Sequence, residues 1–261
     1  MSIIYVPKGK AREYSPLACN LYLTCTYKCK YCYAAESMSG IVKDYFAKPA
    51  PRRDILAKLE AQLRTERITE SVMLSFIGDV HSDTADDGAA TRGALELFLK
   101  YGVPVTILTK GGSRCLRDLD LFRQFGDRIT VGATLTFIDP QKSADWESGA
   151  ATPADRLSTL CALKDAGVRT CASFEPVIEP EESLALIDAS LQLDCIDFYK
   201  IGKLNNYQGL DEHIDWSDFL ARALELLRDK GKRVYIKQAL REAAPNVALK
   251  PEEIRNGYLN A

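Results

Sequence analysis

Three cysteines in one short segment are the residues of this sequence best suited to chemistry. Cys25, Cys29 and Cys32 are spaced four and three residues apart, and Tyr31 and Tyr33 flank the last of them. An iron–sulfur cube takes one thiolate on each of its irons. Three local cysteines would leave one iron open, and an open position is what a catalytic metal site requires. The spacing therefore predicts a catalytic iron–sulfur cluster.

A structural zinc site is the alternative for the same cysteines. Zinc would need a second ligand pair at a suitable spacing. The other candidate ligands are single residues scattered along the chain: Cys115, Cys161, Cys171, Cys195, His81 and His213. The sequence therefore favours the iron–sulfur cluster over zinc.

The pattern C-x3-C-x2-C followed by an aromatic residue resembles the radical S-adenosylmethionine (SAM) superfamily. The resemblance implies that Cys25, Cys29 and Cys32 hold a [4Fe–4S] cluster whose fourth iron chelates SAM. It also implies an external one-electron reductant of the flavodoxin or ferredoxin type. Reduction would then cleave SAM to a 5′-deoxyadenosyl radical, which abstracts a hydrogen atom from the substrate.

Composition limits the class of protein. The chain has 261 residues, of which 46% are hydrophobic and 27% charged, and its net charge is −2. This size suits one domain of barrel type. No apolar run approaches the ~18 residues of a membrane span, and residues 1–7 lack the charged leader of a signal peptide. Eight cysteines without paired spacing predict a reducing cytoplasm. The low net charge argues against a nonspecific nucleic-acid coat, and nothing indicates an oligomeric state.

Short apolar runs alternate with helical patterns along the chain. The predicted strands are residues 18–23, 72–77, 103–108, 129–135, 168–174, 196–201 and 234–236. The predicted helices are residues 52–64, 91–101, 116–125, 153–166, 180–192 and 216–230, several of which end at glycine. Repeated strand–helix units imply a parallel sheet. We expect an α/β fold, a partial (β/α)6 barrel, in a single domain of residues 1–261. Within it we expect a cluster loop at 24–33 and a C-terminal extension from about residue 205 to 261.

Polar residues lie at or just after the carboxyl ends of the predicted strands. In a parallel barrel, the functional residues gather at the carboxyl ends of the strands. The strand ends of this chain carry Asp79, Lys110, Thr134, Glu175 and Lys200. We therefore expect these side chains to meet at one mouth of the barrel, together with the cluster loop.

Further segments resemble the spore photoproduct lyase-like branch of this superfamily. They are residues 20–22 and 32–34, 108–110 with 117–121, 146–149, 156–157 with 166–168, and 174–178. The resemblance implies that Lys110 contacts the SAM carboxylate, that Thr134 takes the place of a SAM-binding serine, and that Tyr31 packs near the adenine. An ammonium group suits a carboxylate partner. A solvated lysine, a plain strand threonine and a packing tyrosine are the alternatives.

One departure from this branch concerns the hydrogen donor. The branch carries a cysteine at the end of its second strand, whereas residues 76–81 contain no thiol. The resemblance, taken with the missing thiol, implies a different reaction: the isomerisation of a modified thymine in DNA. The abstracted hydrogen would return from 5′-deoxyadenosine, or an external electron would reduce the product radical. Lesion repair of the spore photoproduct type and a free small-molecule substrate are the alternatives. A non-enzymatic iron–sulfur module is disfavoured, because such modules are short and supply four local cysteines.

Asp79, Glu175 and Lys200 are the predicted catalytic residues. Glu175 would bind an exocyclic or amino group, and Asp79 would bind ribose hydroxyls; alternatively, each carboxylate pairs with a neighbouring lysine. Lys200, Lys203 and Lys237 would suit an anionic substrate. The basic run in residues 228–241 would contact phosphate, or would simply be a helix C-terminus, where cations are favourable. A target base in DNA would have to leave the stack to reach the barrel interior.

Overall fold

Seven parallel strands in chain order carry the predicted site residues to one edge of a single sheet. The computed structural model describes residues 2–204 and 213–255. Strand β1 (Ile4–Tyr5) is antiparallel to β2 (Leu17–Cys19), and each later strand is parallel to the one before it. These strands are β3 (Val72–Leu74), β4 (Val105–Thr109), β5 (Ile129–Thr134), β6 (Arg169–Val177), β7 (Phe198–Lys203) and β8 (Arg233–Ile236). Since β1 and β8 are the sheet's edge strands, the barrel is not closed.

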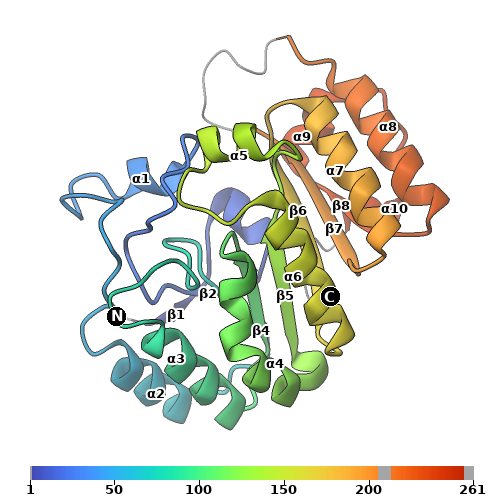
Figure 1. Cartoon of the computed structure of the whole chain (residues 1–261). Coiled ribbons are helices and arrows are strands. Elements are labelled where there is room, and N and C mark those ends of the chain that lie inside the picture. The colour runs from blue at the N-terminus through green and yellow to red at the C-terminus, as the bar shows by residue number, and fades with distance from the viewer. Residues whose placement is uncertain (1, 205–212, 256–261) are drawn as a thin grey trace.

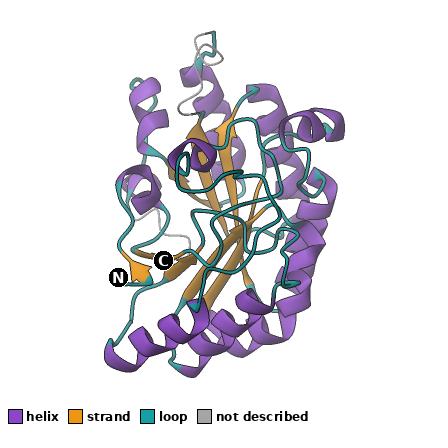
Figure 2. Ribbon diagram, turned by 90° about the vertical axis from the view of Figure 1, so that its left-hand side faces the viewer, coloured by secondary structure: helices purple, strands orange, loops and turns teal. Residues whose placement is uncertain are grey.

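Helices alternate with the parallel strands and follow the last one, and the longer helices run along the outside of the sheet (Figures 1 and 2). They are α1 (Tyr33–Ser37), α2 (Ile55–Thr65), α3 (Ala89–Lys100), α4 (Leu119–Phe125), α5 (Pro140–Trp146), α6 (Pro153–Asp165), α7 (Pro180–Leu193), α8 (Trp216–Asp229), α9 (Gln238–Ala243) and α10 (Pro251–Ile254). Three short 3-10 helices complete the described elements: η1 (Gly9–Glu13), η2 (Gly112–Asp118) and η3 (Gly126–Arg128). None of the described helices is both long and apolar enough to cross a bilayer.

The partial barrel predicted from the sequence is confirmed. All seven predicted strands correspond to β2–β8, and the six predicted helices correspond to α2, α3, α4, α6, α7 and α8. Sequence patterns missed β1, α1, α5, α9 and α10, each of which is too short to establish a period. Strands β2 and β3 end earlier than predicted, because the chain leaves the sheet to form the loops that carry the site. The single-domain boundaries remain a prediction, and residues 205–212 and 256–261 of the predicted extension lie outside the described residues.

Alternation along the strands creates two different environments. On β6, Ala172 and Phe174 belong to the large core under the helices. Cys171, on the opposite face, packs with Phe198 of β7 and Tyr235 of β8 in a separate interior cluster. Successive side chains of a strand point to opposite faces, so this second set lines the inside of the barrel. Further along these strands, toward their carboxyl ends, the residues on this inner face are polar.

Local signals explain how the helices around the site begin. Thr152 caps α6 by accepting a hydrogen bond from Asp155 N at 3.2 Å, and Pro153 occupies the first turn. Asp139 caps α5 in the same way through Gln141 N at 2.7 Å, again with a proline next in sequence. Ser, Thr or Asp before a first-turn proline is a strong helix start. These caps place α5 and the start of α6 at the same end of the sheet as the cluster loop (Figure 1).

Candidate metal and cofactor site

The cluster loop, residues 24–33, leaves the carboxyl end of β2 and gathers the three thiols. Cys25 and Cys29 are each 9% exposed, and all three cysteines are free. The backbone N–H of Cys32 donates to the carbonyl of Cys29 at 3.1 Å, and that of Cys25 donates to the carbonyl of Tyr45 at 2.9 Å. The Tyr45 hydroxyl in turn contacts the Cys32 thiol. The loop is thus held by its own backbone and by one tyrosine.

The chemistry of these donors fits a [4Fe–4S] cluster. Burial, with a contribution from Asp79, raises the pKa of Cys25 to about 12. Burial likewise raises the pKa of Cys29 to about 11, although Lys110 opposes this. The cationic irons would compensate the buried thiolates, so that binding releases protons. Among the described residues no three such ligands are close enough to share one metal ion. A cube places each thiolate on a different iron and therefore needs ligands set farther apart.

The segment between α5 and α6 packs against the cluster loop without space to spare. Gly149 N donates to the Tyr27 carbonyl at 3.0 Å, and Lys30 N donates to the Trp146 carbonyl at 2.9 Å. A Cβ added at Gly149 would lie 2.3 Å from the Thr26 carbonyl oxygen, so only glycine fits this approach. This close contact therefore helps to set the position of the cluster loop at the mouth of the barrel.

Lys110, at the carboxyl end of β4, faces the cluster loop. Its Nζ lies 5.5 Å from the centroid of the Tyr31 ring. Burial alone would lower the pKa of Lys110, but Cys29 and Glu147 outweigh it and the pKa is raised. The ammonium group is thus held charged beside a predicted cluster ligand.

Sequence reasoning missed the role of a buried ion pair behind Tyr31. Glu147 and Arg156 are each 1% exposed, and Nη2 of Arg156 lies 2.5 Å from Oε2 of Glu147. The other carboxylate oxygen, Oε1, accepts a hydrogen bond from the Tyr31 hydroxyl and one from Thr136 at 3.2 Å. Arg156 also donates to the Thr134 carbonyl at 2.9 Å. Both charged residues lie in the family-like segments, but a segment match assigns no partner.

Two other residues that were predicted to contact the cofactor, Tyr31 and Thr134, form hydrogen bonds with this ion pair. Tyr31 has its hydroxyl on Glu147 and stacks at 6.4 Å on Trp146. Thr134 ends β5, is 5% exposed, and holds Arg156 through its backbone oxygen. Tyr31, Lys110 and Thr134 are therefore linked through Glu147 and Arg156 on the cluster side of the mouth.

Asp79 connects the loop after β3 to the end of β4. Its Oδ1 accepts hydrogen bonds from Thr109 Oγ1 at 2.7 Å and from His81 N at 2.9 Å. Its Oδ2 accepts one from the backbone N–H of Lys110 at 2.8 Å. Both carboxylate oxygens are thus used within the protein. This arrangement suits a residue that positions Lys110 better than one that binds ribose.

Glu175 and Lys200 lie in a second charged group, on the β6–β8 side of the barrel. Lys237 donates to both carboxylate oxygens of Glu175 at 2.8 Å, which is the lysine pairing considered from the sequence. Lys237 also lies 3.5 Å from Glu13. Lys200 is fully buried and donates to the Glu13 carbonyl. We call Glu13, Glu175, Lys200 and Lys237 the inner charge cluster.

Two tyrosines complete the surroundings of the inner charge cluster, and no sequence pattern indicated them. Tyr14 donates to Glu175 and lies 3.0 Å from the Ser173 hydroxyl. The Nζ of Lys200 lies 4.1 Å from the Tyr14 ring centroid and 4.5 Å from that of Tyr235. Burial, followed by the charge of Lys237, lowers the pKa of Lys200 to about 7. The Tyr235 hydroxyl also donates to the carboxylate of Glu13 at 2.8 Å, which joins the end of η1 to β8.

Cations of the basic run that was predicted to contact phosphate form ion pairs within the protein. Arg228 makes two hydrogen bonds to Glu253, each of 2.7 Å. Lys232 pairs with Asp194. These contacts favour the structural alternative for the basic run in residues 228–241.

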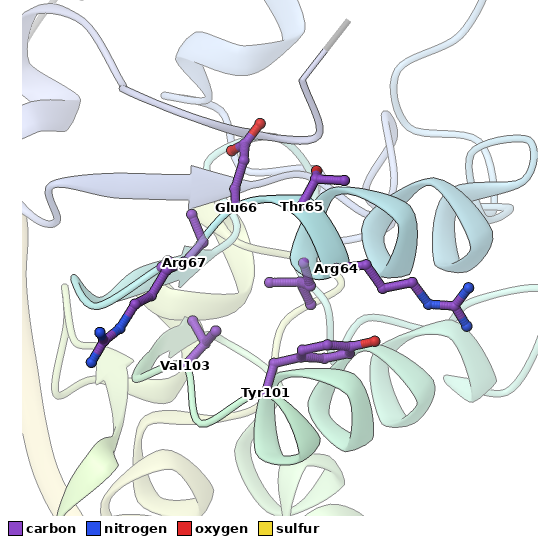
Figure 3. Close-up of a pocket in the computed structure, with 8 residues that line it drawn as sticks. Arg64, Thr65, Glu66, Arg67, Tyr101 and Val103 are labelled. Atoms are coloured by element: carbon purple, nitrogen blue, oxygen red, sulfur yellow. The ribbon is translucent and has the colours of Figure 1, made fainter.

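A hollow elsewhere on the surface has a volume of about 320 Å³ but lies away from this chemistry (Figure 3). It is lined by residues at the C-terminus of α2 and before β4, among them Arg64, Glu66, Arg67 and Tyr101. These segments lead into strands, so they lie at the opposite end of the sheet from the cluster loop. We assign no function to this hollow.

Comparison with known proteins places this site in a family. Residues 19–193 match the family model described as the radical SAM superfamily. An uncharacterised protein of Mycobacterium tuberculosis is 28% identical over 166 residues, which cover 61% of this chain and 48% of that protein. An uncharacterised protein of Methanocaldococcus jannaschii is 29% identical over 160 residues, covering 61% of this chain and 59% of that protein. The chain thus spans about half the length of the curated relatives that it matches.

Two solved structures share the fold at low sequence identity. Streptococcus suis SuiB bound to its precursor peptide SuiA superposes with a TM-score of 0.63 at 14% identity, over 89% of this chain and 52% of that chain. Spore photoproduct lyase complexed with dinucleoside spore photoproduct superposes with a TM-score of 0.60 at 12% identity, over 94% and 66%. These similarities confirm the architecture, which is shared by a protein bound to a precursor peptide and one complexed with a dinucleoside.

Proposed function

The chain belongs to the radical SAM superfamily, and from this premise we propose that it is an enzyme that cleaves SAM reductively. Family members use a [4Fe–4S] cluster and SAM, which together supply a 5′-deoxyadenosyl radical when an electron is delivered. The observation that carries the proposal is the position of Lys110, whose ammonium group lies beside Cys29 and over Tyr31. A cation next to a three-cysteine loop is suited to hold the carboxylate of an amino-acid cofactor.

Each residue on the cluster side has a proposed task. Cys25, Cys29 and Cys32 hold the cluster, and Lys110 binds the SAM carboxylate. Tyr31 and Thr134 shape the cofactor pocket. Asp79 acts as a positioning residue, because it holds the backbone of Lys110 at 2.8 Å. The electron comes from an external flavodoxin- or ferredoxin-type protein, in a reducing cytoplasm.

We propose a pyrimidine-type substrate, a modified thymine in DNA that is isomerised without net redox change. The support is the end of β3, where residues 76–81 offer no thiol to quench a product radical. Tyr14, Glu175 and Lys237 could present hydrogen-bonding groups to the edge of a base; Tyr14 is partly exposed. A base in duplex DNA would have to be flipped out to reach them. The hydrogen atom would return from 5′-deoxyadenosine.

Lesion repair of the spore photoproduct type is a second candidate, and one observation favours it. Cys171 lies on the interior face of the barrel, packed with Tyr235 and against Tyr14. A thiol there could replace the missing donor at the end of β3 if the substrate radical forms nearby. A free small molecule as substrate is the remaining alternative.

Product analysis of the anaerobically reconstituted enzyme tests these proposals. With dithionite or flavodoxin, the protein should release 5′-deoxyadenosine and methionine; failure with an intact, SAM-binding cluster would overturn the SAM-cleavage proposal. With deuterated thymine-containing DNA, the isomerase proposal expects deuterium to pass through 5′-deoxyadenosine and reappear in the product. A Cys171→Ala variant that keeps the fold and cluster but traps a substrate radical would instead support repair through a displaced thiol.

A further inference from the structure

Two cysteines outside the metal site lie against each other. Cys161 is on the middle of α6, and Cys195 is in the loop that leads into β7. Their thiols are in hydrogen-bonding contact, and Cys195 Sγ also lies 4.0 Å from the carbonyl of Leu157, one turn earlier on α6. Both thiols are free. The two residues come from different elements, so tertiary folding creates the pair.

The pair lies at the opposite end of the sheet from the cluster loop. Cys195 precedes β7, whereas the cluster loop follows β2, and the two strands belong to one parallel array. Cluster binding therefore does not require these thiols. Their exposure differs: Cys195 is 3% exposed, while Cys161 is partly exposed. One thiol can thus be reached from solvent, and the other is in contact behind it.

We propose that Cys161 and Cys195 form a redox-modification site, which small disulfides of the glutathione type convert to an intramolecular disulfide. The thiolate of Cys161 attacks the small disulfide, forming a mixed disulfide and releasing one small thiolate. Cys195 then attacks the Cys161 sulfur, forming the protein disulfide and releasing the second small thiol. Two protein thiols are oxidised by two electrons, one small disulfide is reduced to two thiols, and the two protons pass to the products.

The surroundings give each cysteine its place in this sequence. Cys161 reacts first, because the attacking thiol must be accessible. Lys232 donates to the Ile196 carbonyl at 3.3 Å, next to Cys195, and its charge favours a thiolate at that residue. Burial nevertheless raises the pKa of Cys195 to about 12. Burial and the high pKa make Cys195 a slow nucleophile toward reagents in solvent, whereas its contact with Cys161 places it to resolve a mixed disulfide on that neighbour.

The disulfide would tie α6 to the entry of β7. The first turns of α6 carry Arg156, which pairs with Glu147 behind the cluster loop. Oxidation would therefore anchor the helix that supports the cofactor side without touching a cluster ligand.

Anaerobic titration of the reconstituted holoenzyme with mixtures of oxidised and reduced glutathione tests the proposal. After alkylation and trypsin digestion, the peptide of residues 157–164 should be found joined to that of residues 170–200, two hydrogens lighter than their sum. The second peptide also contains Cys171, which makes Cys171→Ser the matched control: it should keep the link. Cys195→Ser should instead stop at a glutathione adduct on Cys161, and Cys161→Ser should give neither product.

Two results would overturn the proposal, and neither depends on a variant folding well. One is a wild-type protein that keeps glutathione on Cys161 without forming the linked peptide. The other is a wild-type protein in which both thiols remain fully alkylatable at glutathione ratios that oxidise the unfolded chain. The iron content of the sample, measured in parallel, confirms that the cluster cysteines did not supply the signal.

Discussion

The two sides of the barrel mouth handle buried charge differently. On the cluster side, the Lys110 ammonium stands beside the Glu147–Arg156 pair, and the Cys29 thiol contributes more to its raised pKa than either nearby carboxylate does. On the other side, the inner charge cluster sets two carboxylates against two amines, and bonds to Glu13 join η1 to β8. A lysine that faces a predicted cluster ligand is suited to an anionic cofactor, whereas the paired charges of the inner charge cluster join η1 to β8.

The largest effect should come from the thiols on the cluster side. Replacing Cys25, Cys29 or Cys32 by alanine removes one of three iron ligands, and each change should abolish the [4Fe–4S] cluster. Iron and sulfide content and visible absorption after anaerobic reconstitution provide the measurement. Cys161→Ser, on the surface of α6, is the control and should retain the cluster. A stoichiometric zinc content without iron–sulfur absorption in the wild type would contradict the assignment.

The next effect tests whether the cluster side depends on its buried pair. Glu147→Gln leaves Arg156 buried without a counter-charge, and removing one partner of a buried pair costs about 3–5 kcal/mol. Urea unfolding of the apoprotein should show this loss. Glu181→Gln is the matched control, because its pair with Arg222 is exposed, and it should leave the urea midpoint nearly unchanged. Equal losses in the two variants would show that the pair does not support the fold.

Lys110→Ala tests the ammonium group of the cluster side. Loss of a charged hydrogen bond costs roughly 1.5–3 kcal/mol, a weakening of SAM affinity of about 10- to 150-fold. Equilibrium binding of SAM to the reconstituted protein gives the value. Lys100→Ala removes an exposed lysine paired with Glu60 on the outside of the barrel and serves as the control. If both variants bind SAM like the wild type, the assignment of Lys110 is wrong.

The sequence predicts the residues of the cluster side better than those of the inner charge cluster. The cysteines are recognisable because their spacing is local, and Lys110 because it ends a strand inside an ordered set of family-like segments. The Glu147–Arg156 contact was missed because the residues, although near in sequence, meet only when α5 and α6 pack on the cluster loop. The sequence left open the pairing of Glu175 with a lysine, but the contact of Glu13 with Lys237 could not be predicted, because these residues lie near opposite ends of the chain. Predicting roles for Glu175 and Lys200 one at a time concealed that they belong to one group.

The smallest predicted effect concerns pH and the inner charge cluster. The pKa of Lys200 is lowered to about 7, first by burial and then by Lys237, whereas an unfolded lysine titrates near ~10.4. Between these values the unfolded chain binds more protons than the native one. The cost of the buried amine is therefore fully present below pH ~7 and is relieved as the pH rises toward ~10.

Comparison with Lys200→Met isolates this term, because the other titrating groups are largely common to the two proteins. The stability of the wild type relative to Lys200→Met should increase by roughly 2 kcal/mol from pH ~7 to ~9. The quantity to compare is the change of this stability difference with pH. Its absolute value is not informative, because the variant also loses the bond to the Glu13 carbonyl and the contacts with Tyr14 and Tyr235. Urea unfolding at a series of pH values measures it. Parallel curves would mean that Lys200 stays charged in the folded protein. The inner charge cluster would then hold two charged amines against two carboxylates throughout this pH range, and the lowered pKa of Lys200 would be wrong.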